Sequence, residues 1–200
     1  MVAVGGPYAT RAQVKFRIGI PDSDTSRDDE VDTALVTGAD TIHRATGRQF
    51  GRAEEASART FVWGPTGVEV DDFWTTDDLL IAGTAYAADT YDLEPVNGIR
   101  DGVPGWPYER IGYPYAVVAH PIYRAYRGSV RVEITAKWGW EAVPANIVEA
   151  NILLAMDDLK SGDAPFGVAG FGDYVVRLRA NPRAAEKLAP YTRSGLKVAS

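Results

Sequence analysis

The sequence predicts an α+β fold, a helical bundle with an inserted antiparallel β region. Apolar residues recur at helical spacing near both ends of the chain. Between Arg59 and Trp140, short segments rich in β-branched and aromatic residues alternate with Gly, Pro, Asp or Asn. We therefore expect residues 1–52 together with 142–200 to form a helical body, and residues 53–141 to form the inserted β region with a long loop.

A short helix is the first predicted element. In the stretch TRAQVKFRI, Val14 and Ile18 fall on one helical face. Thr10 stands at the start of this stretch, and its hydroxyl can cap the free backbone N–H groups of the first turn. We expect a modest helix that begins after Thr10.

A longer helix is predicted from about Arg27 to Thr46. Its apolar residues recur at helical spacing, at Val31, Leu35, Ile42 and Ala45. Ser26, followed three residues later by Asp29, is a capping signal at its start. Gly47 suits the left-handed conformation that commonly ends a helix.

Five segments in the middle of the chain have the composition of strands. They are RTFVW, GVEV, DLLIAG, YDLEP and SVRVEITAKW. Their short length and the turn residues between them predict antiparallel pairing. The run from Pro95 to Pro114 holds too many prolines and glycines for a central strand, so we expect a long loop or an extended arm. The role of its part from Asn97 to Tyr113 stays open.

A long helix is predicted from Pro144, which suits a first helical turn, to about Lys160. It has two apolar sectors. One sector holds Ile147, Ala150 and Leu154, and the other holds Val148, Ile152, Ala155, Met156 and Leu159. A helix with two apolar faces must bury both. We expect one face to serve its own domain and the other to meet the β region or another copy of the chain.

The remaining residues predict a loop, a strand and a short helix. Glycines punctuate residues 162–172, and the stretch DYVVRLRA that follows alternates like a strand. Asn181 and Pro182 combine an N-cap residue with a proline at the first helical position. We therefore expect the stretch RAAEKLA to be helical.

Composition excludes several classes of function. The chain has no cysteine, which rules out disulfides, thiolate catalysis and cysteine-ligated zinc. The net charge of -6 argues against a surface that grips nucleic-acid phosphates. The first residues lack the features of a signal peptide, and no stretch reaches membrane-spanning length. We expect a soluble protein that is made inside the cell.

Charge is distributed unevenly along the chain. From Ala53 to Pro95, Arg59 is the only basic residue among ten acidic ones. From Tyr174 onward the balance reverses, with six basic residues and Glu186 as the only acidic one. Such runs are commonly solvated faces, but an acidic middle and a basic tail can also attract one another between copies or partners.

Sequence motifs for catalysis are missing. The two histidines, His43 and His120, match no metal-binding spacing such as HExxH, and structural, solvent-facing or turn positions are favoured for them. The stretch GVAGFGD precedes a predicted strand, whereas a phosphate-binding loop follows a strand and precedes a helix. No GxSxG elbow occurs. We expect no enzyme activity, no cofactor and no metal.

Two pairs of aspartates are the remaining chemical candidates. Clustered carboxylates such as Asp71-Asp72 and Asp77-Asp78 can serve glycosidic hydrolysis or bind calcium. Neither spacing matches a calcium loop, and adjacent aspartates in an acidic loop are more often solvated. A carbohydrate-binding or hydrolytic β module, with these carboxylates and the tryptophans as its platform, is therefore kept as an alternative function.

Trp138 and Trp140 lie two residues apart at the end of a predicted strand, on the same face. They can wall a ligand pocket or lock a rigid corner between two structural units. Core or interface packing is the favoured use, since large aromatic rings dominate such contacts. We expect the pair to clamp the β region onto the helical body at a fixed angle, just before Pro144.

The order of several motifs gives a family resemblance. The long helix closes in TGR and Phe50, and DDL, LEPVN, VEITAKWGWEAVP and RLRANPRAAEKLAPYTR follow. This combination, which covers most of the chain, resembles the head-tail connector, or adaptor, family of long-tailed bacteriophages. The Trp-Gly-Trp to proline-helix junction and the Thr-Gly-Arg helix end are its most specific parts. The loop from Asn97 to Tyr113 departs from the shortest connectors.

The resemblance implies a structural virion protein in the phage neck. Such connectors form a ring of twelve copies beneath the portal, extend the DNA channel and link the capsid to the tail. The implied partners are other copies of the chain, the portal protein and the next neck or tail-completion protein. Double-stranded DNA passes through the lumen without specific binding, and no membrane is involved. Another neck or tail protein, such as a completion or terminator protein, is a further alternative.

The resemblance also implies roles for individual residues. The carboxy-terminal segment of these connectors tends to dock on the portal, which places Tyr191, Arg193 and Lys197 at that contact. The expected structural junction consists of Trp138, Trp140, Pro144, Arg48 and Phe50.

Overall fold

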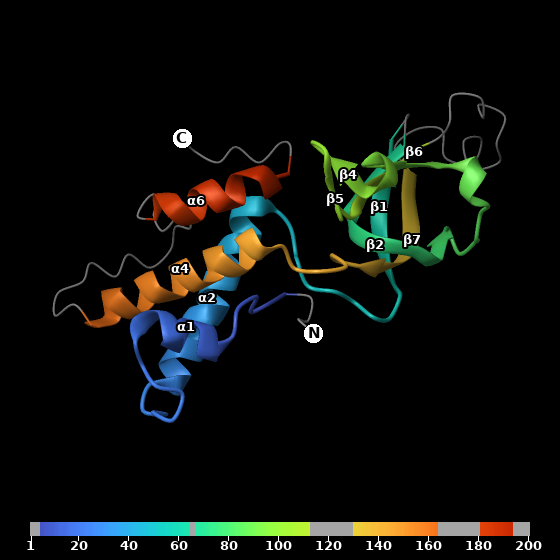
Figure 1. The fold of residues 1–200 in the computed structure, drawn as a ribbon. Helices are drawn as coiled ribbons and strands as arrows, with labels where there is room; N and C mark the ends of the chain where they lie inside the picture. Colours follow the sequence, from blue (N-terminus) through green and yellow to red (C-terminus); the bar gives the residue numbers. More distant parts are fainter. Residues whose placement is uncertain (1–4, 65–66, 113–129, 164–180, 194–200) are drawn as a thin grey trace. The chain divides into compact units, whose positions relative to one another are not determined.

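The computed structural model describes residues 5–64, 67–112, 130–163 and 181–193. The chain divides into two compact units (Figure 1). We call residues 1–51 and 143–200 the helical unit, and residues 52–142 the β unit. The expected division lies one residue from these boundaries on either side. Four helices and an antiparallel sheet confirm the predicted α+β class.

The helical unit contains four α-helices among its described residues. They are α1 (Arg11–Ile18), α2 (Asp28–Thr46), α4 (Ala145–Asp163) and α6 (Pro182–Leu188), and the short 3-10 turn η4 (Ala189–Tyr191) follows α6. The first helix begins as predicted, because Thr10 and Gln13 form a reciprocal capping box. Lys15 joins α1 to α2: its buried Nζ donates to the carboxylate of Asp28 at 2.9 Å.

The two ends of α2 differ in how well they were predicted. Gly47 ends the helix in a left-handed conformation with φ of 67°, as expected. The capping role of Ser26 is wrong, since Arg27 occupies the N-cap position and makes no side-chain capping bond. The amide of Ser26 instead donates to the carboxylate of Asp24 at 3.0 Å, so a local Asp turn precedes the helix.

The two apolar sectors of α4 each contact other elements of the helical unit. Ile152, Ala155 and Leu159 pack in one cluster with residues of α1 and α2. In the other sector, Leu154 lies against Gly38 of α2, and α6 also contacts this helix. The expectation that one face meets the β region or another copy stays a prediction, since Val148 and Met156, in the sector of Ile152, keep part of their surface exposed. Periodicity identifies an apolar face but not the element that covers it.

The last helix begins as predicted, because the side chain of Asn181 accepts a hydrogen bond from the amide of Ala184 at 3.0 Å. Helix α4 extends to Asp163, past its predicted end at Lys160. The rest of the expected glycine loop and the expected strand over 173–180 lie outside the described residues.

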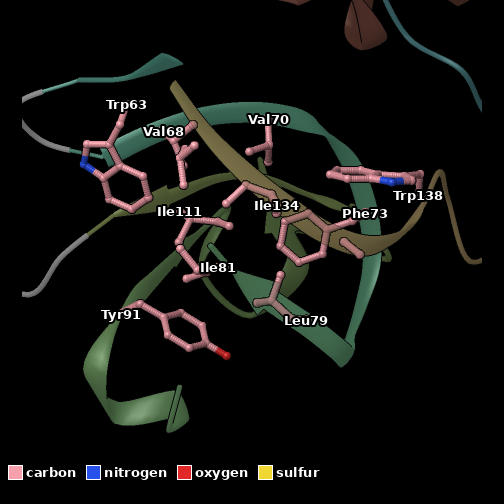
Figure 2. Packing of buried hydrophobic residues seen from close by; sticks show 12 residues of the cluster. Trp63, Val68, Val70, Phe73, Leu79, Ile81, Tyr91, Ile111, Ile134 and Trp138 are labelled. Carbon is pink, nitrogen blue, oxygen red and sulfur yellow. The ribbon is translucent and has the colours of Figure 1, made fainter. Parts of the chain in front are cut away.

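The β unit is built around one antiparallel sheet of five strands. The strand order is β1 (Ser57–Trp63), β7 (Val130–Trp138), β2 (Gly67–Ile81), β6 (Tyr108–Gly112) and β3 (Asp92–Glu94). A second pair, β4 (Ile99–Arg100) and β5 (Val103–Pro104), forms a small hairpin. Figure 2 shows the core of this unit, with Trp63 and Trp138 at opposite ends of the labelled cluster.

The long loop predicted between Pro95 and Pro114 contains structure that was missed. Strand β6 lies inside the sheet, paired with β2 on one side and β3 on the other. The error has a simple cause: the prolines at 104, 107 and 114 flank Tyr108–Gly112, and this five-residue stretch contains none. Composition averaged over the whole run concealed a short strand.

Strand β2 is also longer than expected. It joins the predicted segment GVEV and the first four residues of DLLIAG into one strand, which ends at Ile81 and has irregular register between Phe73 and Leu80. Asp71 and Asp72 therefore lie within a strand and not in an acidic loop. None of the helices that the structure describes is long and apolar enough to cross a membrane.

Candidate functional site

The segment that follows α6 folds back onto the end of α2. Nε of Arg48 donates to the carbonyl oxygen of Tyr191 at 2.7 Å. The amide of Arg193 donates to the carbonyl oxygen of Thr46 at 3.0 Å. Arg48 is only 3% exposed, so its hydrogen bond is shielded from water. We call Thr46, Arg48, Phe50, Tyr191 and Arg193 the tail anchor.

Aromatic rings complete this anchor. Phe50 is fully buried, and its ring meets those of Tyr8 and Tyr191 edge-on, each at 5.7 Å between ring centres. The amide of Phe50 donates to the hydroxyl of Tyr8 at 2.9 Å. The same hydroxyl contacts Nε2 of His43, and burial lowers the pKa of that imidazole. Because Tyr8 accepts from Phe50, its own proton can be donated to a neutral His43.

The tail anchor brings together residues from two predicted sets. Arg48 and Phe50 were expected at a structural junction, and Tyr191 and Arg193 at a docking surface. Their contact joins positions 143 residues apart in the sequence. Tyr8 was missed as a member of this cluster, since a single tyrosine before an N-cap carries no sequence signal. Lys197, also expected at the docking surface, lies outside the described residues.

The other members of the expected junction are divided between the two units. Pro144 belongs to the helical unit, and its carbonyl oxygen accepts from the amides of Ile147 and Val148 at 2.9 and 3.2 Å. Trp138 and Trp140 belong to the β unit. The clamp between the units that these tryptophans were expected to form stays a prediction.

Trp138 packs in the core of the β unit. Its ring is 1% exposed and contacts those of Phe61 and Phe73. Its indole N–H donates to the carbonyl oxygen of Ser57 at 2.8 Å, and Arg59 stacks on the ring with 4.6 Å between guanidinium and ring centre. The predicted preference for packing is therefore borne out for this side chain within its own unit.

Trp140 is held by a buried carboxylate. Its indole N–H donates to Oδ2 of Asp72 at 2.9 Å, and both side chains are almost completely buried. The ring of Trp106 lies 5.1 Å away, centre to centre. Asp72 is thus an acceptor within the packing of the β unit, although its sequence context suggested a solvated residue.

The remaining candidate carboxylates are either paired or exposed. Asp71 forms an ion pair with Arg59 at 2.6 Å, and Asp78 forms one with Lys137 at 2.9 Å. Asp77 is exposed. Across the described residues, no three His, Cys, Asp or Glu side chains gather in a group that could hold a metal ion. His120 lies outside the described residues.

The tryptophans offer little free surface for stacking a sugar ring. Trp63, Trp138 and Trp140 are buried. The two others are partly covered by cations: Arg52 lies 4.0 Å from the ring centre of Trp74, and Arg100 lies 4.6 Å from that of Trp106. An aromatic platform for carbohydrate needs exposed ring faces, so this arrangement suits packing better than sugar binding.

The two units differ in charge. The β unit has 14 acidic and 8 basic residues, so its net charge is -6. The helical unit has 13 of each, so the whole net charge of the chain resides in the β unit. The negative charge of the β unit repels phosphate groups, which disfavours tight binding of nucleic acid by this unit.

Comparison with models of known protein families finds no family that matches the chain, and a search of curated proteins finds no relative. The resemblance to phage connectors consequently rests on the motifs in the sequence. Two of these motifs meet in the tail anchor, TGR at Thr46 to Arg48 and YTR at Tyr191 to Arg193.

Proposed function

We propose that this chain is a structural virion protein, a head-to-tail connector or adaptor. In this role it forms a ring beneath the portal, extends the DNA channel and links the capsid to the tail. The observation that carries the proposal is the tail anchor. It fixes the start of the carboxy-terminal segment on the helical unit through Arg48 and Phe50, which gives Tyr191 and Arg193 defined positions for a docking contact.

Two further observations support the proposal. DNA slides more easily through a lumen whose surface does not bind its phosphates tightly. The β unit, which carries the entire net charge of -6, offers such a surface. The candidate carboxylates Asp71, Asp72 and Asp78 each have a partner, so the described residues assemble no pair for hydrolysis. The carbohydrate alternative therefore loses the features on which it was based.

The test is imaging of the purified chain, alone and mixed with the portal protein. We expect rings, with twelve copies as the resemblance implies, or a ring on the portal. A chain that stays monomeric over a concentration series and does not bind portal would contradict the proposal. Binding to a tail-completion partner without binding to portal would favour the alternative of another neck or tail protein.

The docking role of the carboxy-terminal segment is tested separately. Lys197→Glu reverses a charge of the expected docking set, and we expect it to weaken portal binding. Lys160→Glu is the matched control, because Lys160 is an exposed residue of α4 outside that segment. Equal binding by the two variants would remove the docking role while leaving the ring itself untouched.

A further inference from the structure

A small hairpin of the β unit is held in a fixed conformation. Asp101 and Gly102 join β4 to β5, and their φ angles of 53° and 79° are those of a tight two-residue hairpin turn. The amide of Trp106 donates to the carbonyl oxygen of Gly98 at 3.0 Å. The guanidinium of Arg100 stacks on the ring of Trp106 at 4.6 Å. These contacts give the hairpin a defined shape before it meets any partner.

This hairpin carries exposed apolar side chains on both of its faces. Ile99 and Val103 are 46 and 57% exposed, and Val96, three residues before the hairpin, is 66% exposed. Ile99 pairs with Pro104 and Val103 pairs with Arg100, so Ile99 and Val103 leave the ribbon on opposite sides. Single exposed apolar residues need no explanation, but a cluster of them marks an interaction surface. A wedge that is apolar on both faces fits a groove better than a flat surface.

A groove of this kind lies on the helical unit, between α1 and the start of α4. Its volume is about 500 Å³, and its apolar lining consists of Phe16, Val143, Ala145, Val148 and Ile152. Phe16 is the most exposed large apolar side chain among the described residues, at 83%. Arg17 and Glu149 also line the groove and form an ion pair at 2.6 Å.

We propose that the β4–β5 hairpin of one copy of this chain inserts into the α1–α4 groove of the next copy. The inference deepens the proposed function, on which it rests, by naming the two surfaces that join neighbouring copies. A projection and a groove on different units are two different patches. A contact between different patches is heterologous, and it repeats from copy to copy until a suitable rotation closes the ring.

Charge favours a second copy as the occupant of the groove. Of the three cations of α1, Lys15 is buried against Asp28 and Arg11 is paired with Asp28 and Asp32, so Arg17 is the cation of this helix that lines the groove. The hairpin presents the exposed Asp101 at its tip, within a unit whose net charge is -6. The acidic tip of the hairpin can contact Arg17, which keeps 44% of its side chain exposed beside its partner Glu149.

Because the chain has no cysteine, introduced thiols give a direct test. Copies with Phe16→Cys and differently tagged copies with Val103→Cys are mixed and oxidised. We expect disulfide-linked dimers that contain both tags, and a ladder of larger species from the double variant. Val36→Cys replaces Phe16→Cys in the matched control, because Val36 is an exposed apolar residue of α2 outside the groove. A double variant that links only within one chain would overturn the proposal, since the hairpin would then occupy its own groove.

Charged substitutions give a second measurement that does not depend on thiol geometry. Val103→Asp and Phe16→Asp should each raise the dissociation constant for self-association by at least about tenfold. The two variants mixed together should form dimers and nothing larger, because a single intact contact remains between them. Val62→Asp and Val36→Asp alter exposed apolar residues elsewhere and should assemble like the original chain. Normal assembly by either test variant would overturn the proposal.

All variants are compared by sedimentation, with and without portal protein. If the original chain forms rings only on the portal, the same comparison is made for the portal-bound material. Rings that persist in Val103→Asp and Phe16→Asp would contradict the hairpin contact but not the connector function. If the original chain neither self-associates nor binds portal, the proposed function is contradicted, and the hairpin contact that rests on it is contradicted as well.

Discussion

The side-chain nitrogen of Asn151 in α4 donates to the backbone carbonyl of Leu35 in α2 at 3.0 Å. Its side-chain oxygen accepts from the amides of Tyr8 and Ala9 at 2.9 and 3.1 Å. Gly38 leaves room for this group, since a Cβ atom there would lie 2.6 Å from the Asn151 nitrogen. One fully buried amide thus joins the amino-terminal segment, α2 and α4.

Asn151→Leu should destabilise the helical unit by about 2–4 kcal/mol, because it leaves buried N–H groups without an acceptor. Asn146→Leu, at an exposed position of the same helix, should change the free energy of unfolding by less than about 0.5 kcal/mol. Far-ultraviolet circular dichroism during chemical denaturation measures both. Equal effects of the two substitutions would show that the Asn151 hydrogen bonds contribute little.

Trp138→Ala should destabilise the β unit by about 3–5 kcal/mol, because it opens a large cavity in the core of that unit. All five tryptophans belong to the β unit, so their fluorescence reports the unfolding of this unit. Trp74→Ala removes a half-buried ring and should cost about 1–2 kcal/mol. A Trp138→Ala variant with unchanged unfolding but altered ligand binding would support the pocket interpretation instead.

The stability of the helical unit should fall as the pH drops below about 6.5. Burial lowers the pKa of His43 from its ordinary value of 6.5, although Asp40, 3.9 Å away, acts in the opposite direction. Above 6.5 both the folded and the unfolded chain hold a neutral imidazole. Below it the unfolded chain takes up a proton first, so the free energy of unfolding decreases until the folded state also titrates.

His43→Gln should remove this decline, since a glutamine oxygen can still accept from the hydroxyl of Tyr8. Chemical denaturation at several pH values measures the effect, and His120→Gln is the control at the only other histidine. Lys15 lowers the pKa of Asp28 from 3.8, and Arg11 lowers that of Asp32, so these two carboxylates reduce the free energy of unfolding only at lower pH, where they become protonated. A decline near 6.5 that persists in His43→Gln would assign it to another group.

Arg48→Met should loosen the tail anchor, because the carbonyl of Tyr191 loses its buried donor. The amide of Arg193, which donates to Thr46, should then exchange with solvent at least about tenfold faster. Hydrogen exchange followed by nuclear magnetic resonance measures this rate. Arg44→Met removes an exposed arginine from α2, four residues before Arg48, and should leave the rate unchanged. Unchanged exchange in Arg48→Met would mean that the aromatic contacts alone hold the segment.

Local signals in the sequence predicted the helices well. Thr10 and Asn181 cap helix starts as expected, and Gly47 ends α2 in the left-handed conformation. Each of these features depends on a few neighbouring residues. A capping side chain bonds to the first turn of its own helix, and a glycine adopts the left-handed conformation at the helix end. The error at Ser26 is of the same local kind, because Asp24 offers its carboxylate to the amide of Ser26.

The candidate site was predicted less completely. Arg48, Phe50, Tyr191 and Arg193 were each singled out, but nothing in the sequence brought the two pairs together. Asp72 gives another example, since a neighbouring aspartate suggested a solvated loop while strand β2 carries the side chain into contact with Trp140. Strand β6 was missed because flanking prolines dominate the composition around it.

The sequence by itself determined the α+β class, the main helices and the apolar faces that had to be covered, because these depend on residue type and on spacing of a few positions. Only the tertiary structure decided which element covers which face, as with α1 and α2 over the second sector of α4. It also decided that the end of α2 meets the segment after α6. Contacts between distant positions depend on the path of the whole chain, and short-range periodicity carries no information about that path.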